Sequence, residues 1–350
     1  MPSIDRRLLI ADLAFLGDTL MTTPVITNLR RNHPHAILDF LVSDESAVVV
    51  RHNQDLNEVI EVDKATYRKN GWKDLAALAE RLKIKHYDTV FLVHRSARTA
   101  LLALMAGIPS RVGLATQGRR LLLTHPVALD ETRHRTDNAL ALLTAVGEPI
   151  STRTLAFTPA PGAAFRAEGL LFHHGWSGSV PLIALAPGGS WVTKRWAPER
   201  FAAVATLLDQ AGYRVAVVGG PGDMALAETV QQRTTARLMN LAGATTFDEL
   251  FEVFRRCAGV IANDSGPMHL AAAAGVPLVG LFGPTSPARC GPVSHAATTL
   301  AGDVPCLGCY FKQCEHHSCM AYLAPRQVLQ SLEGLFREAG ILEPLAVEPT

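Results

Sequence analysis

The chain has 350 residues and a formal net charge of +1, with 48% hydrophobic and 19% charged residues. This composition is typical of a globular protein with a large core and excludes a disordered chain. The near-neutral charge argues against bulk nucleic-acid binding, so no nucleic acid is expected as a partner.

The N-terminal half alternates strand and helix signals. Such alternation predicts a parallel sheet with helices on both faces. The expected elements are a strand at 8–13, a short loop at 14–18, a helix from 19, strands at 36–44 and 56–63, a helix from 72 leading to a strand that ends at 94, and a helix from 98 followed by a short strand before 115.

The pattern breaks around residues 148–180, which are rich in proline, glycine and small polar residues, and then resumes. We therefore expect an α/β protein with two Rossmann-like domains. The expected parts are an N-terminal domain at 1–155, a linker at 156–178, a C-terminal domain at 179–330, and a helix and tail at 331–350. Ligands of such sheets bind at the carboxyl ends of the strands, so the expected site is a cleft between the two domains.

No apolar run reaches the roughly 18–20 residues that a membrane span needs. Asp12 and Asp18 interrupt the apolar run near the N-terminus, and no small-residue cleavage site follows, so no signal peptide is expected. These features predict a cytoplasmic protein with reduced cysteines. Arginines cluster at 6–7, 30–31, 119–120 and 133–135, either on solvated faces or as a basic rim for an anionic substrate or membrane surface.

The loop "NDSGPMH" (263–269) is predicted to join a strand to a helix N-terminus, where unpaired N–H groups favour anions. Ser265 and Gly266 would let a phosphate approach these groups, and His269 would reach the same anion. The alternative is that Asp264 or Ser265 is a plain N-cap and His269 a partly exposed helix residue.

The loop "PGGSWVTKRW" (187–196) offers an N–H-rich turn followed by Lys194, which could neutralise a diphosphate leaving group. The alternative is a surface lysine packed between Trp191 and Trp196. In a third loop, "GGPGD", Asp223 could bind a ribose hydroxyl or merely serve its own turn.

The first loop lacks the G-x-G-x-x-G fingerprint, which argues against a dinucleotide oxidoreductase. It carries Gly17, which suits close approach of a ligand, and then Asp18. If the C-terminal half binds a nucleotide diphosphate, Asp18 is placed to take a proton from an acceptor hydroxyl. The alternative is that Asp18 only caps the helix that follows.

The stretches "LGDTLMTTPV", "LMAGIPSRVGL", "APGGSWVTKRW", "VVGGPGD" and "ANDSGPMHLAAAAGVPLVGLFGPTSP" together resemble the family-9 glycosyltransferases, the heptosyltransferases of lipopolysaccharide core synthesis. They occur in family order over nearly the whole chain, and the first and third look closer to the second and third heptosyltransferases than to the first. The resemblance implies a two-domain GT-B fold whose last helix crosses back to the first domain. It also implies inverting transfer from ADP-heptose to the Kdo or heptose of the lipid A-linked inner core.

The same resemblance implies site residues. Asp18 would be the base and Lys194 would contact the donor diphosphate, without a required cofactor. The enzyme would work at the inner face of the cytoplasmic membrane without spanning it. His94, Arg95 and Arg98, expected at a strand end that faces the same cleft, are candidate acceptor contacts, and surface packing is the alternative. In the family the "DSG..H" loop binds the ADP-sugar, which places donor contacts at Asp264, Ser265, Gly266 and His269. From their own positions in the loops at strand ends, the other candidate donor contacts are Gly17, Gly188, Gly189, Ser190, Thr193 and Asp223.

Four cysteines, Cys306, Cys309, Cys314 and Cys319, have the spacing C-x2-C-x4-C-x4-C. Four soft ligands in so short a span could hold a structural zinc, and free thiols in a packed loop are the alternative. Alternatives also remain open for the function: a UDP-sugar transferase or epimerase of the same double fold, or a non-catalytic ADP-sugar-binding protein.

Overall fold

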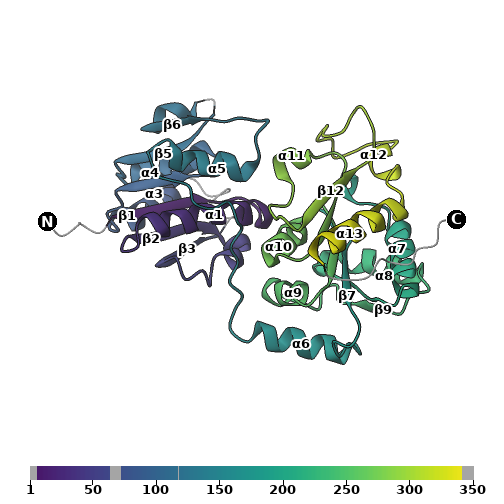
Figure 1. The fold of residues 1–350 in the computed structure, drawn as a ribbon. Helices are drawn as coiled ribbons and strands as arrows, with labels where there is room; N and C mark the ends of the chain where they lie inside the picture. The colour runs from purple at the N-terminus through teal and green to yellow at the C-terminus, as the bar shows by residue number, and fades with distance from the viewer. Residues whose placement is uncertain (1–5, 64–71, 117, 341–350) are drawn as a thin grey trace. The chain divides into compact units, whose positions relative to one another are not determined.

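The computed structural model describes residues 6–63, 72–116 and 118–340. The chain divides into two compact units, Met1–Thr158 (unit 1) and Pro159–Thr350 (unit 2), each built on one parallel six-stranded sheet (Figure 1). None of the helices in these described ranges is long and apolar enough to cross a membrane.

Unit 1 has the strand order β3-β2-β1-β4-β5-β6. The inner strands β2, β1 and β4 are almost entirely buried, as expected for a parallel sheet covered on both faces. Its elements are β1 (Arg7–Asp12), α1 (Leu16–Asn32), β2 (Ile37–Ser43), η1 (Asp44–Val49), β3 (Glu58–Val62), α3 (Trp72–Lys83), β4 (Thr89–Leu92), α4 (Ala97–Met105), β5 (Ser110–Ala115), η2 (Arg119–Leu122), β6 (His125–Ala128) and α5 (Arg135–Thr144).

Unit 2 has the order β12-β11-β10-β7-β8-β9. Its elements are α6 (Ala163–His173), β7 (Leu182–Ala186), η3 (Val192–Lys194), α7 (Pro198–Gln210), β8 (Arg214–Val217), η4 (Pro221–Asp223), α8 (Met224–Gln232), β9 (Leu238–Asn240), α9 (Phe247–Phe254), β10 (Gly259–Asn263), α10 (Gly266–Ala274), β11 (Leu278–Phe282), α11 (Pro287–Cys290), β12 (Ala297–Ala301), α12 (Ser318–Ala321) and α13 (Pro325–Ala339).

The two sheets are wound in the same way. In each, the first strand of the unit pairs with the second on one side and with the fourth on the other. The winding therefore reverses between β1 and β4 in unit 1 and between β7 and β10 in unit 2. Open parallel sheets bind ligands at the carboxyl ends of the strands beside this reversal. The topology thus points to the loops after β1, β4, β7 and β10.

Local sequence signals fix several helix ends. Thr246 and Glu249 form a capping box at the start of α9, where each side chain accepts the other residue's backbone N–H. Gly275 caps the C-terminus of α10 and Gly340 that of α13, and both glycines have a positive φ that residues with a Cβ rarely adopt.

The segment 156–178, expected to be a linker, contains helix α6. Ala163, Ala167 and Leu171 are buried at a spacing of four residues and form a narrow apolar stripe that packs on α9. The small side chains of this stripe gave only a weak helical signal beside the surrounding proline and glycine. The last helix, α13, lies in unit 2, where it packs against α7, β10, β11 and β12 (Figure 1).

Gly259, at the start of β10, lies directly against α13. A Cβ built on this residue would lie 2.8 Å from Leu332 Cδ1 and 3.1 Å from the Phe336 ring, and both side chains are buried. We predict that Gly259→Ala lowers the free energy of unfolding by about 1–3 kcal/mol, because neither side chain can move away.

Gly169→Ala is the matched control, measured by the same denaturant titration. Gly169 lies inside α6 and its added Cβ would meet nothing within 4 Å. This variant should gain roughly 0.5–1 kcal/mol from helix propensity. A neutral Gly259→Ala would show that α13 can shift on the sheet.

Candidate active site

Asn263, the last residue of β10, joins the two loops at the sheet reversal of unit 2. Its side-chain N–H donates to the Pro187 carbonyl oxygen at 2.7 Å, and its Oδ1 accepts the Trp196 backbone N–H at 3.1 Å. One buried amide thus holds both ends of the 187–196 loop against the strand that precedes the 264–269 loop. The sequence analysis did not assign Asn263 to the site. An amide directly after a buried strand was the available signal.

Lys194, at the end of η3, forms an ion pair with Asp264. Its Nζ lies 2.8 Å from Asp264 Oδ2, and the two side chains are only 14% and 5% exposed. The Thr285 hydroxyl donates to the same carboxylate oxygen at 2.6 Å. Asp264 therefore binds Lys194 and is not the N-cap of α10, and Lys194 is not a simple surface lysine.

Ser265 occupies the N-cap position of α10, but its side chain makes no capping bond and donates instead to the Asn263 carbonyl oxygen at 3.0 Å. Gly266 is the first helical residue. The positive end of α10 thus lies beside the Lys194–Asp264 pair, an arrangement that suits an anion. His269 follows one turn later and is buried at 3% exposure, so the alternative that it is a partly exposed helix residue is wrong.

Asp223 connects the loop after β8 to the loop after β7. Its carboxylate accepts the Gly220 backbone N–H at 3.1 Å, as expected of a turn residue. A Cβ on Gly188 would lie only 2.6 Å from this carboxylate, so the absence of a side chain at 188 is what lets the two loops approach. In the neighbouring turn, Arg195 Nε donates to the Gly189 carbonyl oxygen at 2.9 Å.

In unit 1, Gly17 and Asp18 lie in the first turn of α1, which begins at Leu16, and not in the preceding loop. The Asp18 carboxylate forms an ion pair with Arg135, the first residue of α5. The sequence analysis counted Arg135 only as a member of a basic cluster. The structure makes it the partner of the predicted base.

Asp12, the last residue of β1, is a second carboxylate near Asp18 that the sequence analysis did not assign to the site. It is 1% exposed and accepts the Thr22 hydroxyl at 2.7 Å. Burial raises the pKa of Asp12 to about 6, the Thr22 bond lowers it, and the negative charge of Asp18 raises it further.

The residues expected to contact an acceptor follow β4. The backbone N–H of His94 bonds to the Ala11 carbonyl oxygen at 3.3 Å, which places His94 next to the end of β1. Arg95 is exposed and lies 3.7 Å from Glu131, while Arg98 is half-buried in the first turn of α4. All three therefore lie at the carboxyl edge of the unit 1 sheet.

Two of the clustered arginines, Arg119 and Arg30, fit neither the solvated-face nor the basic-rim interpretation. Arg119 is completely buried, donates to the Leu92 carbonyl oxygen at 3.1 Å, and has its pKa lowered to about 10 by burial. Arg30 donates to backbone carbonyl oxygens of Asp55 and Ala36 at 2.9 and 2.8 Å. These arginines hold unit 1 together.

The cysteine-bearing segment 302–319 (the cysteine loop) packs on η3. Thr193 Oγ1 donates to the Phe311 carbonyl oxygen at 2.9 Å, and a ring nitrogen of His317 lies 2.6 Å from the Thr193 carbonyl oxygen. Cys319 is buried in α12, and burial followed by the nearby thiols raises its pKa. Within the described ranges, no group of three or more His, Cys, Asp or Glu side chains is arranged to hold a metal ion.

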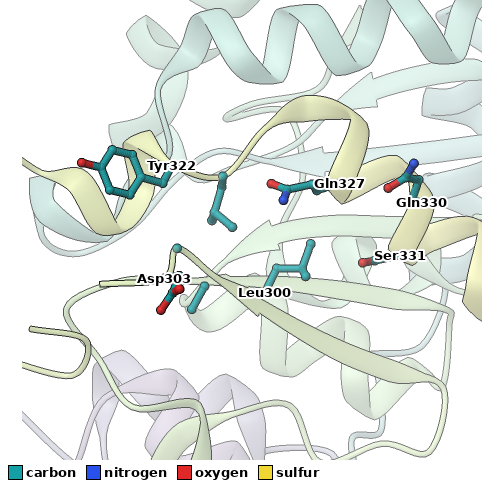
Figure 2. Close-up of a pocket in the computed structure, with 9 residues that line it drawn as sticks. Leu300, Asp303, Tyr322, Gln327, Gln330 and Ser331 are labelled. Carbon is teal, nitrogen blue, oxygen red and sulfur yellow. The ribbon is translucent and has the colours of Figure 1, made fainter. Parts of the chain in front are cut away.

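A separate pocket of about 460 Å³ lies beside the base of the cysteine loop. Figure 2 shows Gln327, Gln330 and Ser331 of α13 facing Leu300 and Asp303 across this hollow. None of its lining residues belongs to the loops at the sheet reversal, so it is not the predicted donor site.

Residues 75–319 match the profile of glycosyltransferase family 9 (heptosyltransferase), which covers more than half of the chain. The chain belongs to this family. This match confirms the family that the sequence motifs indicated, and the chain is therefore a glycosyltransferase. The matched stretch includes Lys194 and Asp264, whereas Asp18 lies before it.

Two curated family members are similar over most of their length. The chain is 28% identical to lipopolysaccharide heptosyltransferase 2 of Escherichia coli K12, with 94% of this chain and 98% of the relative covered. It is 26% identical to lipopolysaccharide heptosyltransferase 2 of Salmonella typhimurium, with 96% and 100% covered.

Solved structures confirm the GT-B fold. The family-9 glycosyltransferase of Veillonella parvula superposes with a TM-score of 0.84 at 27% identity, covering 96% of this chain and 98% of that one. The ADP-heptose lipopolysaccharide heptosyltransferase II of Escherichia coli gives a TM-score of 0.76 at 26% identity, covering 96% and 99%.

The raised pKa of Asp12 predicts how the free energy of unfolding depends on pH. Because the folded pKa of about 6 exceeds the ordinary value of 3.8, folding favours the protonated form. The wild type should therefore lose up to roughly 3 kcal/mol of stability as the pH rises from about 4 to 7. Asp12→Asn removes this loss, and Thr22 keeps an acceptor in the Asp18 carbonyl oxygen at 3.2 Å.

The measurement is denaturant unfolding of the wild type and Asp12→Asn between pH 4 and 8. The stability advantage of the variant should be small near pH 4 and largest above pH 7. Asp74→Asn, which removes an exposed carboxylate of the same unit, is the control for net charge. A constant difference between Asp12→Asn and wild type would contradict the prediction.

Proposed function

We propose that this glycosyltransferase moves a heptose from ADP-heptose to the inner core of lipopolysaccharide, with inversion at the anomeric carbon. The observation that carries the proposal is the Lys194–Asp264 pair beside the N-terminus of α10, at the reversal of the unit 2 sheet. The similarity to heptosyltransferases supports the choice of sugar and acceptor.

Unit 2 would bind the donor. Lys194 would offset the negative charge that develops on ADP as the bond from the anomeric carbon to phosphate breaks, and the first turn of α10 would add its N–H groups and dipole. Asp264 neutralises Lys194 and holds it in place. The proposed donor contacts also include Gly188, Gly189, Ser190 and Asp223, together with Thr193, Ser265, Gly266 and His269.

Unit 1 would supply the base. Asp18 would take the proton of an acceptor hydroxyl while that oxygen attacks the anomeric carbon on the face opposite the leaving ADP. One bond to carbon forms as one breaks, so the step inverts the centre without a covalent intermediate. Arg135 would hold the Asp18 carboxylate in position. Gly17 would allow close approach of the ligand.

The acceptor would be the Kdo or heptose of a lipid A-linked inner core. His94, Arg95 and Arg98, at the same edge of unit 1 as Asp18, would bind this anionic glycolipid. We propose that the enzyme is cytoplasmic and acts as a peripheral protein at the inner face of the cytoplasmic membrane.

A ligand panel tests the donor assignment. Thermal unfolding is measured with ADP, ADP-heptose, UDP, UDP-N-acetylglucosamine and NAD at matched concentrations, where saturation at about 100 times the dissociation constant adds roughly 2.7 kcal/mol. Stabilisation by the two ADP ligands alone is expected. Stabilisation by the UDP ligands alone would replace the proposal with a UDP-sugar transferase or epimerase.

Asp18→Asn tests the base. The variant should lower kcat for heptose transfer at least about 100-fold, because the amide cannot accept the proton. Its KM for ADP-heptose should change little, because the donor contacts are assigned to unit 2. Asp137→Asn is the matched control, since Asp137 also pairs with an arginine, Arg153, on the surface of unit 1. A normal kcat in Asp18→Asn would exclude Asp18 as the base and favour a different role.

We also propose that Cys306, Cys309, Cys314 and Cys319 hold a structural zinc. The backbone N–H of His317 donates to Cys314 Sγ at 3.3 Å, a bond that suits a thiolate. Tyr310 and His317, which follow the second and third cysteines, have positive φ angles and make tight turns. Among the described residues, no three His, Cys, Asp or Glu side chains are arranged around one point. Zinc binding would therefore require the four cysteine thiols to move closer together.

Zinc content measured by mass spectrometry tests this site. About one zinc per chain is expected in the purified wild type, and Cys306→Ser with Cys309→Ser should remove it and lower the thermal stability. Cys257→Ser, at a buried thiol outside the loop, is the control and should retain the metal. A metal-free wild type reconstituted with zinc that gains no stability would contradict the proposal.

A further inference from the structure

Residues 159–350 contain only two lysines, Lys194 and Lys312, and the fold brings both to one side chain. Lys194 Nζ lies 4.8 Å and Lys312 Nζ 5.2 Å from the centroid of the Trp191 ring. These lysines are 118 positions apart in the chain. Their meeting is a product of the tertiary structure.

The backbone around Lys312 is fixed next to the backbone around Lys194. Thr193, adjacent to Lys194, donates its hydroxyl to the carbonyl oxygen of Phe311, adjacent to Lys312, at 2.9 Å. The contact of His317 with the Thr193 carbonyl oxygen at 2.6 Å holds the same part of the cysteine loop from its other end. Thr193 is itself buried, whereas Phe311 and Lys312 are exposed, so the junction ties an exposed part of the cysteine loop to a buried residue of the 187–196 loop.

The two lysines differ in their charge environment. Asp264 neutralises Lys194 at 2.8 Å, whereas no carboxylate of the described residues lies within ion-pair distance of the exposed Lys312. A cation over an exposed aromatic ring gains only about 0.5–1 kcal/mol, which is modest for an ammonium group held beside a second cation. A ligand with two or more negative charges would use both.

We propose that Lys312 is a second cation for the diphosphate of the donor and that Trp191 is the platform that directs it there. This inference rests on the proposed function, which places the diphosphate at Lys194. It adds a binding residue delivered by the cysteine loop, so the position of that loop would also set the affinity for the donor.

Calorimetric titration with ADP and with adenosine tests the inference. Lys312→Gln should weaken ADP binding roughly 1.5- to fivefold, as expected for loss of one exposed charge interaction. Its affinity for adenosine, which has no phosphate, should stay at the wild-type value. Lys312→Arg should bind ADP like the wild type, and the defect of Lys312→Gln should shrink at high salt.

Arg237→Gln is the matched control. Arg237 is an exposed cation of unit 2 that precedes β9, at the amino edge of the same sheet, so its loss changes the net charge equally without touching the loops. This variant should bind ADP like the wild type. An equal loss of ADP affinity in Arg237→Gln would show a general charge effect and overturn the role of Lys312.

Two other results would also overturn the inference. Unchanged ADP binding in Lys312→Gln would remove Lys312 from the site, and equal losses for ADP and adenosine would reduce it to a packing residue. If the wild type binds UDP and not ADP, the donor of the proposed function is wrong, and the same comparison with UDP and uridine decides the role of Lys312. Binding of neither nucleotide overturns both proposals.

Discussion

The ion pair between Lys194 and Asp264 is the interaction on which the carboxyl edge of the unit 2 sheet depends. Both groups are largely removed from water, and each is stable there only because the other is present. Removing one partner would leave a buried charge uncompensated, at a cost of about 3–5 kcal/mol. The pair therefore fixes the end of η3 against the start of α10, and a diphosphate would enter a site whose cation is already in place.

The sheet topology explains why this pair forms where it does. Lys194 follows β7 and Asp264 follows β10, and these two strands are neighbours across the reversal of the unit 2 sheet. Asn263 then binds backbone groups at both ends of the 187–196 loop, so the loop has little freedom to move Lys194 away. The same winding in unit 1 places Asp12 and His94 on neighbouring strand ends.

Two neighbouring carboxylates of unit 1, Asp12 and Asp18, differ in their burial and in their partners. Asp12 is buried at the strand end, where burial raises its pKa to about 6, whereas Asp18 lies in the first turn of α1, partly exposed and paired with Arg135. Strand position and burial thus make one acid a buried structural group and leave the other partly exposed. In unit 2, the cysteine loop likewise has a structural role, because its contacts with Thr193 hold η3 in place.

The sequence by itself determined the fold class, the family and the glycine-rich loops at the strand ends of unit 2, because strand–helix alternation and glycine-rich strand ends are local signals. It missed β6, β9 and β12, which are short and lie toward the sheet edges, and it missed α6, whose apolar stripe is small. Only the tertiary structure decided which charges meet. The pairing of Asp18 with Arg135, the burial of Arg119 and the approach of Lys312 to Trp191 join residues far apart in the chain, and such contacts depend on packing that no local pattern encodes.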